Sequence, residues 1–146
     1  MTPVKKIKEI FEVNFFSQSE FTQYIAKSMI KNKKGSILYI SSTSGLDNNI
    51  GRSAYSSSKA AMISQSMSLA GELGAFNIRV NSIAPGLTDT DMMRLNTSKE
   101  IINEVLQDTA LKRIAKPEEI ANVALFLSSD LASYVTGQVI RVDGGI

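Results

Sequence analysis

The stretch SILYISSTSGLDNNIGRSAYSSSKAAMISQSMSLAGELGAFNIRVNSIAPG, residues 36–86, decides the fold. Its first six residues form a short, mostly apolar run rich in β-formers, which predicts a strand covered on both faces. Residues 53–75 carry small and apolar side chains at helical spacing, and residues 77–84 predict a second strand that ends at Pro85-Gly86. Two strands joined by a helix favour a parallel pair with a right-handed crossover.

The flanking sequence continues this alternation. Residues 7–34 predict a long helix that can bend near its middle, with Gly35 as its stop. Further on, residues 98–109 predict another helix, Pro117 begins a third, and residues 138–142 predict a third strand. The sequence therefore predicts an α/β fold in which a parallel sheet is covered by helices on both sides.

Length and composition favour one domain over residues 1–146. The chain is 43% hydrophobic and carries a formal net charge of only +2, which is typical of a single globular unit. It has no Cys and no His, so disulfides, thiol nucleophiles, Cys/His zinc sites and His-based triads are excluded. We therefore predict no metal site, and acid/base chemistry falls to Tyr, Lys, Asp or Glu.

The sequence predicts neither a membrane partner nor a nucleic-acid partner. No apolar run approaches the ~18–20 residues of a membrane span, and no signal-peptide pattern opens the chain. We expect a cytoplasmic protein. The basic clusters at residues 5–8 and 31–34 lack interleaved aromatic side chains, which favours solvated helix ends over nucleic-acid contacts.

A glycine-rich turn between a first strand and a first helix is absent from the sequence. Dinucleotide-binding α/β domains normally cradle the cofactor phosphates with such a turn. The strand predicted at residues 36–41 would lie in the middle of an ordinary doubly wound sheet. We therefore expect the C-terminal part of a longer Rossmann-like domain, in which this strand presents an unpaired apolar edge.

Tyr55 and Lys59 are four residues apart, which places a phenol and an ammonium on one face of the predicted helix. At ~4 Å and an effective dielectric constant near 20, phenolate and ammonium attract each other by about 4 kcal/mol. Such a tyrosine can give a proton to a carbonyl oxygen during reduction, or take one from an alcohol during oxidation. The pair alone is more typical of an exposed helix surface, so the surrounding residues must decide.

Ser42 begins the polar loop directly after the first predicted strand, where open α/β sheets place ligand-binding loops. Its hydroxyl can hold a substrate carbonyl beside Tyr55, although a serine-rich stretch after a strand is at least as often only a turn. Asn14 lies close to an apolar helical stripe, where a polar side chain needs a hydrogen-bond partner. A bond to local backbone and a functional water or lysine relay are both open for Asn14.

The turn at residues 85–90 follows the second predicted strand. It offers backbone amides and the hydroxyls of Thr88 and Thr90 at the carboxyl edge of the sheet. A flat, amide-bearing ring can dock there, although a Pro-Gly turn is more commonly only a turn.

In this order and spacing, the four sites resemble the short-chain dehydrogenase/reductase family, whose pattern is Asn, then Ser, then Tyr-x-x-x-Lys, then a Pro-Gly-x-x-x-Thr turn. Residues 113–129 are similar to the closing helix of the family, and residues 134–145 to its last strand and tail. The similarity spans essentially the whole chain and is nearest to β-ketoacyl-acyl-carrier-protein reductases and their hydroxysteroid or sugar-alcohol relatives. The family's glycine-rich phosphate loop and its Asn-Asn-Ala-Gly strand end are absent.

The resemblance implies a role for each matching residue. Tyr55 corresponds to the general acid/base and Lys59 to the residue that favours its ionised form. Ser42 corresponds to the residue that orients the carbonyl, and Asn14 to the helix asparagine that supports a water linked to the lysine.

The resemblance also implies NADP or NAD as cofactor. Tyr55 and Lys59 would contact the nicotinamide ribose, and the nicotinamide carboxamide would contact the turn residues Pro85, Gly86, Leu87, Thr88 and Thr90. Hydride transfer itself is the chemistry of the cofactor.

Two hypotheses follow from the resemblance. The first is an oxidoreductase that transfers a hydride between NAD(P)H and a ketone or secondary alcohol, with a 3-oxoacyl-carrier-protein-like substrate as in fatty acid biosynthesis. The alternative is a non-catalytic truncated remnant that oligomerises with intact relatives through residues 1–34 and 53–75. Both predict a homo-oligomer, a dimer or tetramer.

Overall fold

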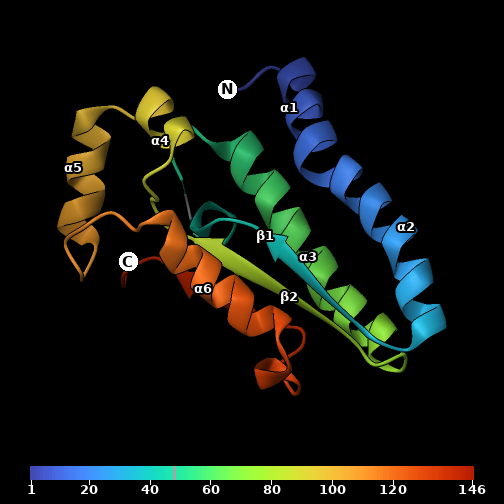
Figure 1. The fold of residues 1–146 in the computed structure, drawn as a ribbon. Helices are drawn as coiled ribbons and strands as arrows, with labels where there is room; N and C mark the ends of the chain where they lie inside the picture. Colours follow the sequence, from blue (N-terminus) through green and yellow to red (C-terminus); the bar gives the residue numbers. More distant parts are fainter. Residues whose placement is uncertain (48) are drawn as a thin grey trace.

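Helices and strands alternate along the chain as the sequence predicts. The computed structural model describes residues 1–47 and 49–146. In chain order the elements are α1 (Val4–Phe11), the π-helix η1 (Glu12–Phe16), α2 (Ser17–Asn32), β1 (Gly35–Ile40), the 3-10 helix η2 (Thr43–Gly45), α3 (Ser53–Gly74), β2 (Ile78–Pro85), α4 (Asp91–Asn96), α5 (Lys99–Asp108), α6 (Pro117–Ser128), the 3-10 helix η3 (Asp130–Ala132) and β3 (Val139–Val142) (Figure 1).

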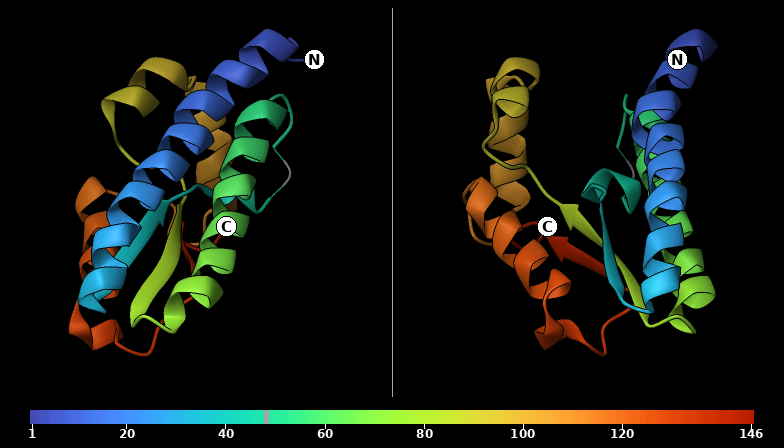
Figure 2. Two further views of the ribbon diagram at one scale, coloured as in Figure 1. Left: turned by 90° about the vertical axis from the view of Figure 1, so that its right-hand side faces the viewer. Right: turned by 45° about the vertical axis from the view of Figure 1, so that its right-hand side comes forward.

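The strands form a parallel sheet in the order β1-β2-β3. Helices α2 and α3 cover one face, and α6 covers the other, so the molecule has three layers (Figure 2). This arrangement confirms the predicted α/β class. Since all three strands run in the same direction, the loops after β1 and β2 meet at one edge of the sheet.

The core lies on both faces of β2. Val80 faces α2 and α3, Ile83 faces α6, and both have 0% of their surface exposed. The small side chains of α3 allow close packing: Ser82 on β2 donates a buried hydrogen bond of 2.7 Å from its hydroxyl to the hydroxyl of Ser66 on α3. The apolar and β-branched content of β2 thus places it at the centre of the sheet.

The first helical segment differs from the predicted single helix. It begins at Val4, passes through the π-helical segment η1, and ends at Asn32. Lys33, not Gly35, stops it by adopting a left-handed conformation with φ 49°. The carbonyl of Lys33 accepts a hydrogen bond of 3.2 Å from the Asn77 side chain, which supports the turn; Gly35 already belongs to β1.

The second strand also departs from its predicted end. Pro85 still pairs with Val142 of β3. Proline has no N–H donor, but a strand terminus tolerates it. Helix α4 was not expected from the sequence; Thr90 caps its N-terminus by accepting a hydrogen bond from the Met93 amide. None of the helices in the described part of the chain is long and apolar enough to cross a bilayer.

Strand β1 forms one edge of the sheet: within residues 1–47 and 49–146 no strand pairs with its outer side. Ile37 and Tyr39 are buried against the helices. On the opposite face, Leu38 packs against the α6 cluster, but Ile40 is 45% exposed. The prediction of burial on both faces is therefore wrong at the end of β1, where Ile40 is not among the residues that pack against the α6 cluster.

Candidate active site

Tyr55 and Lys59 lie in the first two turns of α3, on the same side of the helix. The Lys59 ammonium nitrogen is 5.8 Å from the centroid of the Tyr55 ring, and both side chains are half-buried. The four-residue spacing therefore brings the phenol and the ammonium together as predicted.

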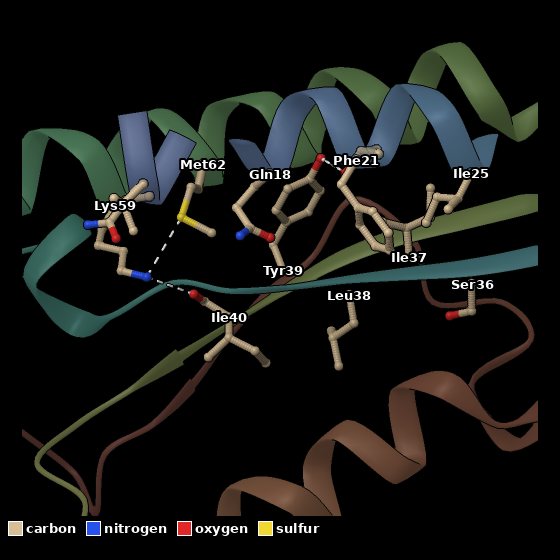
Figure 3. A pocket seen from close by; sticks show the side chains of 13 residues that line it. Gln18, Phe21, Ile25, Ser36, Ile37, Leu38, Tyr39, Ile40, Lys59 and Met62 are labelled. Atoms are coloured by element: carbon tan, nitrogen blue, oxygen red, sulfur yellow. Dashed lines mark hydrogen bonds between the residues drawn. The ribbon is translucent and has the colours of Figure 1, made fainter. Parts of the chain in front are cut away.

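The Lys59 ammonium reaches across to the end of β1. It donates a hydrogen bond of 3.0 Å to the carbonyl oxygen of Ile40 and lies 3.7 Å from the sulfur of Met62 (Figure 3). Burial lowers the pKa of Lys59, since desolvation disfavours the charged form. An ammonium has three donors, so a single carbonyl leaves capacity to bind hydroxyl groups of a ligand.

Ser42 follows β1 and begins the loop of residues 42–47, called here the Ser42 loop. Its hydroxyl accepts a hydrogen bond of 3.2 Å from the Ser44 amide and thereby caps η2. No hydrogen bond joins the hydroxyls of Ser42 and Tyr55 in the part of the chain that the structure describes. In this cap the Ser42 oxygen only accepts a hydrogen bond, so the cap does not use the hydroxyl proton.

The Ser42 loop is seated directly on α3. A Cβ atom at Gly45 would lie 2.9 Å from the backbone of Lys59 and Ala60, so only glycine permits this approach. The neighbouring Ser41 donates a hydrogen bond of 2.9 Å from its hydroxyl to the carbonyl of Lys59. These contacts hold the start of the loop beside the turn of α3 that carries Lys59.

Asn14 lies in the π-helical segment η1 and bonds to α3 rather than to nearby backbone. Its side-chain amide donates a hydrogen bond of 3.0 Å to the hydroxyl of Ser58, which in turn donates to the carbonyl of Tyr55 at 2.7 Å. Ser58 is fully buried. Asn14 is thereby joined to the helical turn between Tyr55 and Lys59.

Ser58 was not singled out from the sequence. Its only signal is its position three residues after Tyr55, which places its hydroxyl near the Tyr55 carbonyl on the inner side of the helix. Nothing in the sequence pairs it with Asn14, because the two residues are 44 positions apart. π-helical segments are frequent at functional sites, but the sequence pattern of residues 7–34 does not reveal one.

The segment of residues 85–90, called here the Pro85 turn, packs tightly on the chain that follows β3. A Cβ atom at Gly86 would lie 2.8 Å from Asp143, and the Gly86 amide donates to the carbonyl of Val142 at 3.0 Å. The Asp89 amide donates to the carbonyl of Ala115 at 2.9 Å. Two amides of the turn are therefore used within the protein.

The hydroxyls of the Pro85 turn are also engaged. Thr88 donates a hydrogen bond of 3.1 Å to the carbonyl of Gly86, and the Thr90 oxygen serves as the α4 cap. Among the described residues, the amides of Leu87 and Thr88 make no hydrogen bond. The Thr90 amide likewise makes no hydrogen bond there, so three backbone donors of the turn are left for a ligand.

A groove runs between the outer edge of β1 and helices α2 and α3 (Figure 3). Its volume is about 410 Å³, and both Asn14 and Lys59 line it. Tyr39 closes its inner wall through a buried hydrogen bond of 2.9 Å that its hydroxyl donates to Thr22. Burial outweighs this hydrogen bond and raises the pKa of Tyr39, so this phenol stays neutral.

Comparison with known proteins places this geometry in a family. A family model described as Enoyl-(Acyl carrier protein) reductase matches residues 1–146. The chain is 44% identical over 139 residues to the 3-oxoacyl-[acyl-carrier-protein] reductase FabG of Aquifex aeolicus, and 42% identical over 143 residues to the 7alpha-hydroxysteroid dehydrogenase of Escherichia coli. These matches cover 95% and 98% of the chain.

A solved structure agrees. The 7 alpha-hydroxysteroid dehydrogenase complexed with NADH and 7-oxo glycochenodeoxycholic acid superposes with a TM-score of 0.95 at 42% identity, over 99% of this chain. The chain belongs to the short-chain dehydrogenase/reductase family. It spans 56% of the length of each of these three relatives, and its sheet is the corresponding part of a Rossmann-like fold.

Proposed function

We propose that the chain is the catalytic part of an NAD(P)-dependent oxidoreductase that interconverts a ketone and a secondary alcohol. The observation that carries the proposal is the cluster at the start of α3: Tyr55 and Lys59 share one helix side, the Ser42 loop packs on the same turn, and Asn14 joins it through Ser58. A phenol beside an ammonium, next to a hydroxyl whose proton no described residue accepts, is the set of groups that polarises and protonates a carbonyl.

In this mechanism each residue acts at a stated atom. The Ser42 hydroxyl donates to the substrate carbonyl oxygen and holds it toward Tyr55. The Tyr55 phenol gives its proton to that oxygen as negative charge develops, and the positive charge of Lys59 stabilises the phenolate that remains. In the oxidation direction the same phenolate takes the proton from the alcohol.

The residues present fit the nicotinamide end of the cofactor. The spare donors of Lys59 suit ribose hydroxyls, and the amides of Leu87 and Thr88 suit a carboxamide; Pro85, Gly86 and Thr90 shape the turn that presents these amides. When bound, the nicotinamide supplies or accepts the hydride. Asn14 would hold a water that passes protons toward Lys59.

For the substrate we propose a 3-oxoacyl thioester or a related ketone. The two sequence relatives described above reduce or oxidise at a carbon bearing oxygen, by their names, on an acyl-carrier-protein-linked chain or a steroid. The three residues between Tyr55 and Lys59 fit ketone reductases rather than enoyl reductases, for which the resemblance implies a wider gap. We also propose that residues 1–146 form one part of a longer domain and that the chain forms homo-oligomers.

Calorimetric titration of the 146-residue chain with NADPH, and then with NADH, tests the proposal. We expect saturable binding that Lys59→Ala weakens by roughly tenfold or more, as for a lost charge-assisted hydrogen bond. Lys27→Ala, at an exposed position of α2, is the matched control and should bind as the parent does. Reduction of a 3-oxoacyl thioester is then assayed with the cofactor that binds.

Failure to bind either cofactor, by a chain that circular dichroism shows to be folded, would contradict the proposal for this chain. It would mean that the rest of the longer domain is essential for binding, and that this polypeptide is a fragment or the non-catalytic alternative, which only associates with intact relatives. Light scattering then becomes decisive, because a monomer would count against that alternative as well.

A further inference from the structure

Arg141 on β3 joins parts of the chain that are far apart in sequence. Its two terminal nitrogens donate to the two carboxylate oxygens of Asp47 at 2.9 and 2.8 Å, across 94 residues. Its Nε donates to Asp143 at 2.7 Å. This two-bond geometry fixes the relative orientation of both groups, as the planar guanidinium fork permits.

Asp47 is the last residue of the Ser42 loop. Its amide donates a hydrogen bond of 2.9 Å to the carbonyl of Thr43, within the tight turn that begins at Ser42. The middle of this loop packs on α3 at Gly45. By binding the Asp47 carboxylate, Arg141 therefore restrains the last residue of the segment that presents the Ser42 hydroxyl.

Asp143 is in direct contact with the Pro85 turn. Gly86 packs so closely that a Cβ atom would lie 2.8 Å from Asp143, and the Asp143 side chain is only 7% exposed. Burial opposes the ionisation of Asp143, but hydrogen bonds from the Gly145 amide and from Arg141 outweigh it and hold its pKa below the usual range. The atoms next to Gly86 are the Cα and Cβ of Asp143, so a shift of the Asp143 backbone would displace the surface against which Gly86 packs.

We propose that Asp47, Arg141 and Asp143 form a positioning element that fixes the Ser42 loop relative to the Pro85 turn. Its consequence for catalysis rests on the proposed function: the hydroxyl that orients the carbonyl and the turn that receives the nicotinamide would be held at a set separation. None of the three residues needs to touch substrate or cofactor, because each acts through the backbone segment that carries it. Small errors in such a separation are costly for a transfer reaction.

Amide hydrogen exchange on the whole chain tests this proposal without any need for turnover. Two amides report on the Ser42 loop, those of Gly45 and Leu46, and the Gly86 amide reports on the Pro85 turn; all three are hydrogen-bonded. In Asp47→Ala we expect exchange to become faster by roughly threefold or more at all three amides, as for the loss of a well-formed ion pair. Asp47→Glu, which restores a carboxylate, should bring the rates back toward those of the parent.

Glu9→Ala is the matched control. Glu9 also carries an exposed carboxylate in an ion pair, at 3.2 Å from Lys6 on α1, but α1 does not contribute to either segment. Its replacement should leave the three amides unchanged. Faster exchange at Gly45 and Leu46 with no change at Gly86 would overturn the proposal and reduce Asp47 to a local anchor; no change at any of the three would overturn it as well.

The kinetic consequence is measured separately, in a preparation that reduces a ketone. There Asp47→Ala should lower kcat by a larger factor than it changes the KM of the cofactor, because both groups remain present but are no longer aligned. An equal effect of Glu9→Ala would contradict this. If the parent chain neither binds NADPH nor turns over, the proposed function fails while the exchange result still decides whether the element exists.

Discussion

Ile40 and Ile83 face each other across the β1–β2 ladder, yet their environments are opposite. Ile83 has no exposed surface and belongs to the α6 cluster, whereas Ile40 is 45% exposed. The same side chain in paired positions therefore contributes very differently to burial, because Ile83 lies on the central strand within the α6 cluster, whereas Ile40 lies at the end of a strand that is an edge of the described sheet. The comparison separates the part of the sheet that stabilises the fold from the part that carries the candidate chemistry.

Ser42 and Lys59 of the candidate site lie near the less buried end of β1. Ser42 is the second residue after β1, and Lys59 bonds to the carbonyl of Ile40 itself. A charged side chain at the end of an edge strand also discourages unwanted strand pairing. We infer that the residues of the site are held by hydrogen bonds and close backbone contacts, whereas Val80 and Ile83 of β2 are held by apolar packing.

The largest effect is expected for Tyr55→Phe, which removes one hydroxyl from the site and none from the core. The kcat of ketone reduction should fall by about 10²–10⁴-fold, the usual contribution of a general acid, with an unchanged midpoint of thermal unfolding. Turnover is measured in the preparation that reduces a ketone, and unfolding by circular dichroism. Tyr24→Phe, at a position 77% exposed, is the control; undiminished turnover in Tyr55→Phe would remove this residue from the mechanism.

The second prediction tests the two isoleucines directly. Ile83→Ala should lower the free energy of unfolding by about 2–5 kcal/mol, since it leaves a cavity in a packed core. Ile40→Ala should cost less than about 1 kcal/mol, as is usual for a partly exposed position. Urea unfolding of the two variants measures both values. Equal losses would break the comparison, because they would mean that the edge of β1 is covered in solution.

Most of the fold could be predicted from local sequence patterns. The features that could not be predicted depend on contacts between residues far apart in the sequence. The periodicity of residues 53–75 and the β-rich run at residues 36–41 predict α3 and β1 because these signals lie within one element. The exposure of Ile40 could not be predicted in this way, because it depends on which distant elements pack over the end of β1. Helix α4 is only six residues long, too short for a periodic signal.

The candidate site shows the same division. Tyr55 and Lys59 are recognisable because one helix turn sets their distance, and the structure places them together. The partner of Asn14 is Ser58, 44 residues away, and Arg141 reaches Asp47 across 94 residues. Such pairs are set by the packing of separate elements, so a single sequence gives no signal for them.

The smallest effect, a change in how stability depends on pH, is expected for Glu119→Gln at the start of α6, the helix that covers Ile83. Hydrogen bonds from Arg113, at 2.7 and 2.6 Å, and from the Lys116 amide lower the pKa of Glu119 to about 2, well below the ordinary range of a glutamate. A carboxyl with a lowered pKa stabilises the fold above its unfolded pKa, and this contribution is lost as the pH falls through the folded value. The parent chain should therefore lose stability between about pH 5 and pH 2 through this group.

In Glu119→Gln this part of the acid sensitivity should disappear, so that the urea midpoints of variant and parent converge as the pH falls. The difference should stay small because the pair is exposed and screened by water and salt. Glu118→Gln, at the neighbouring exposed position, should keep the acid sensitivity of the parent. A Glu119→Gln chain that loses stability in acid as steeply as the parent would show that the covered side of the sheet does not depend on this ion pair, and that apolar packing around Ile83 alone holds α6 in place.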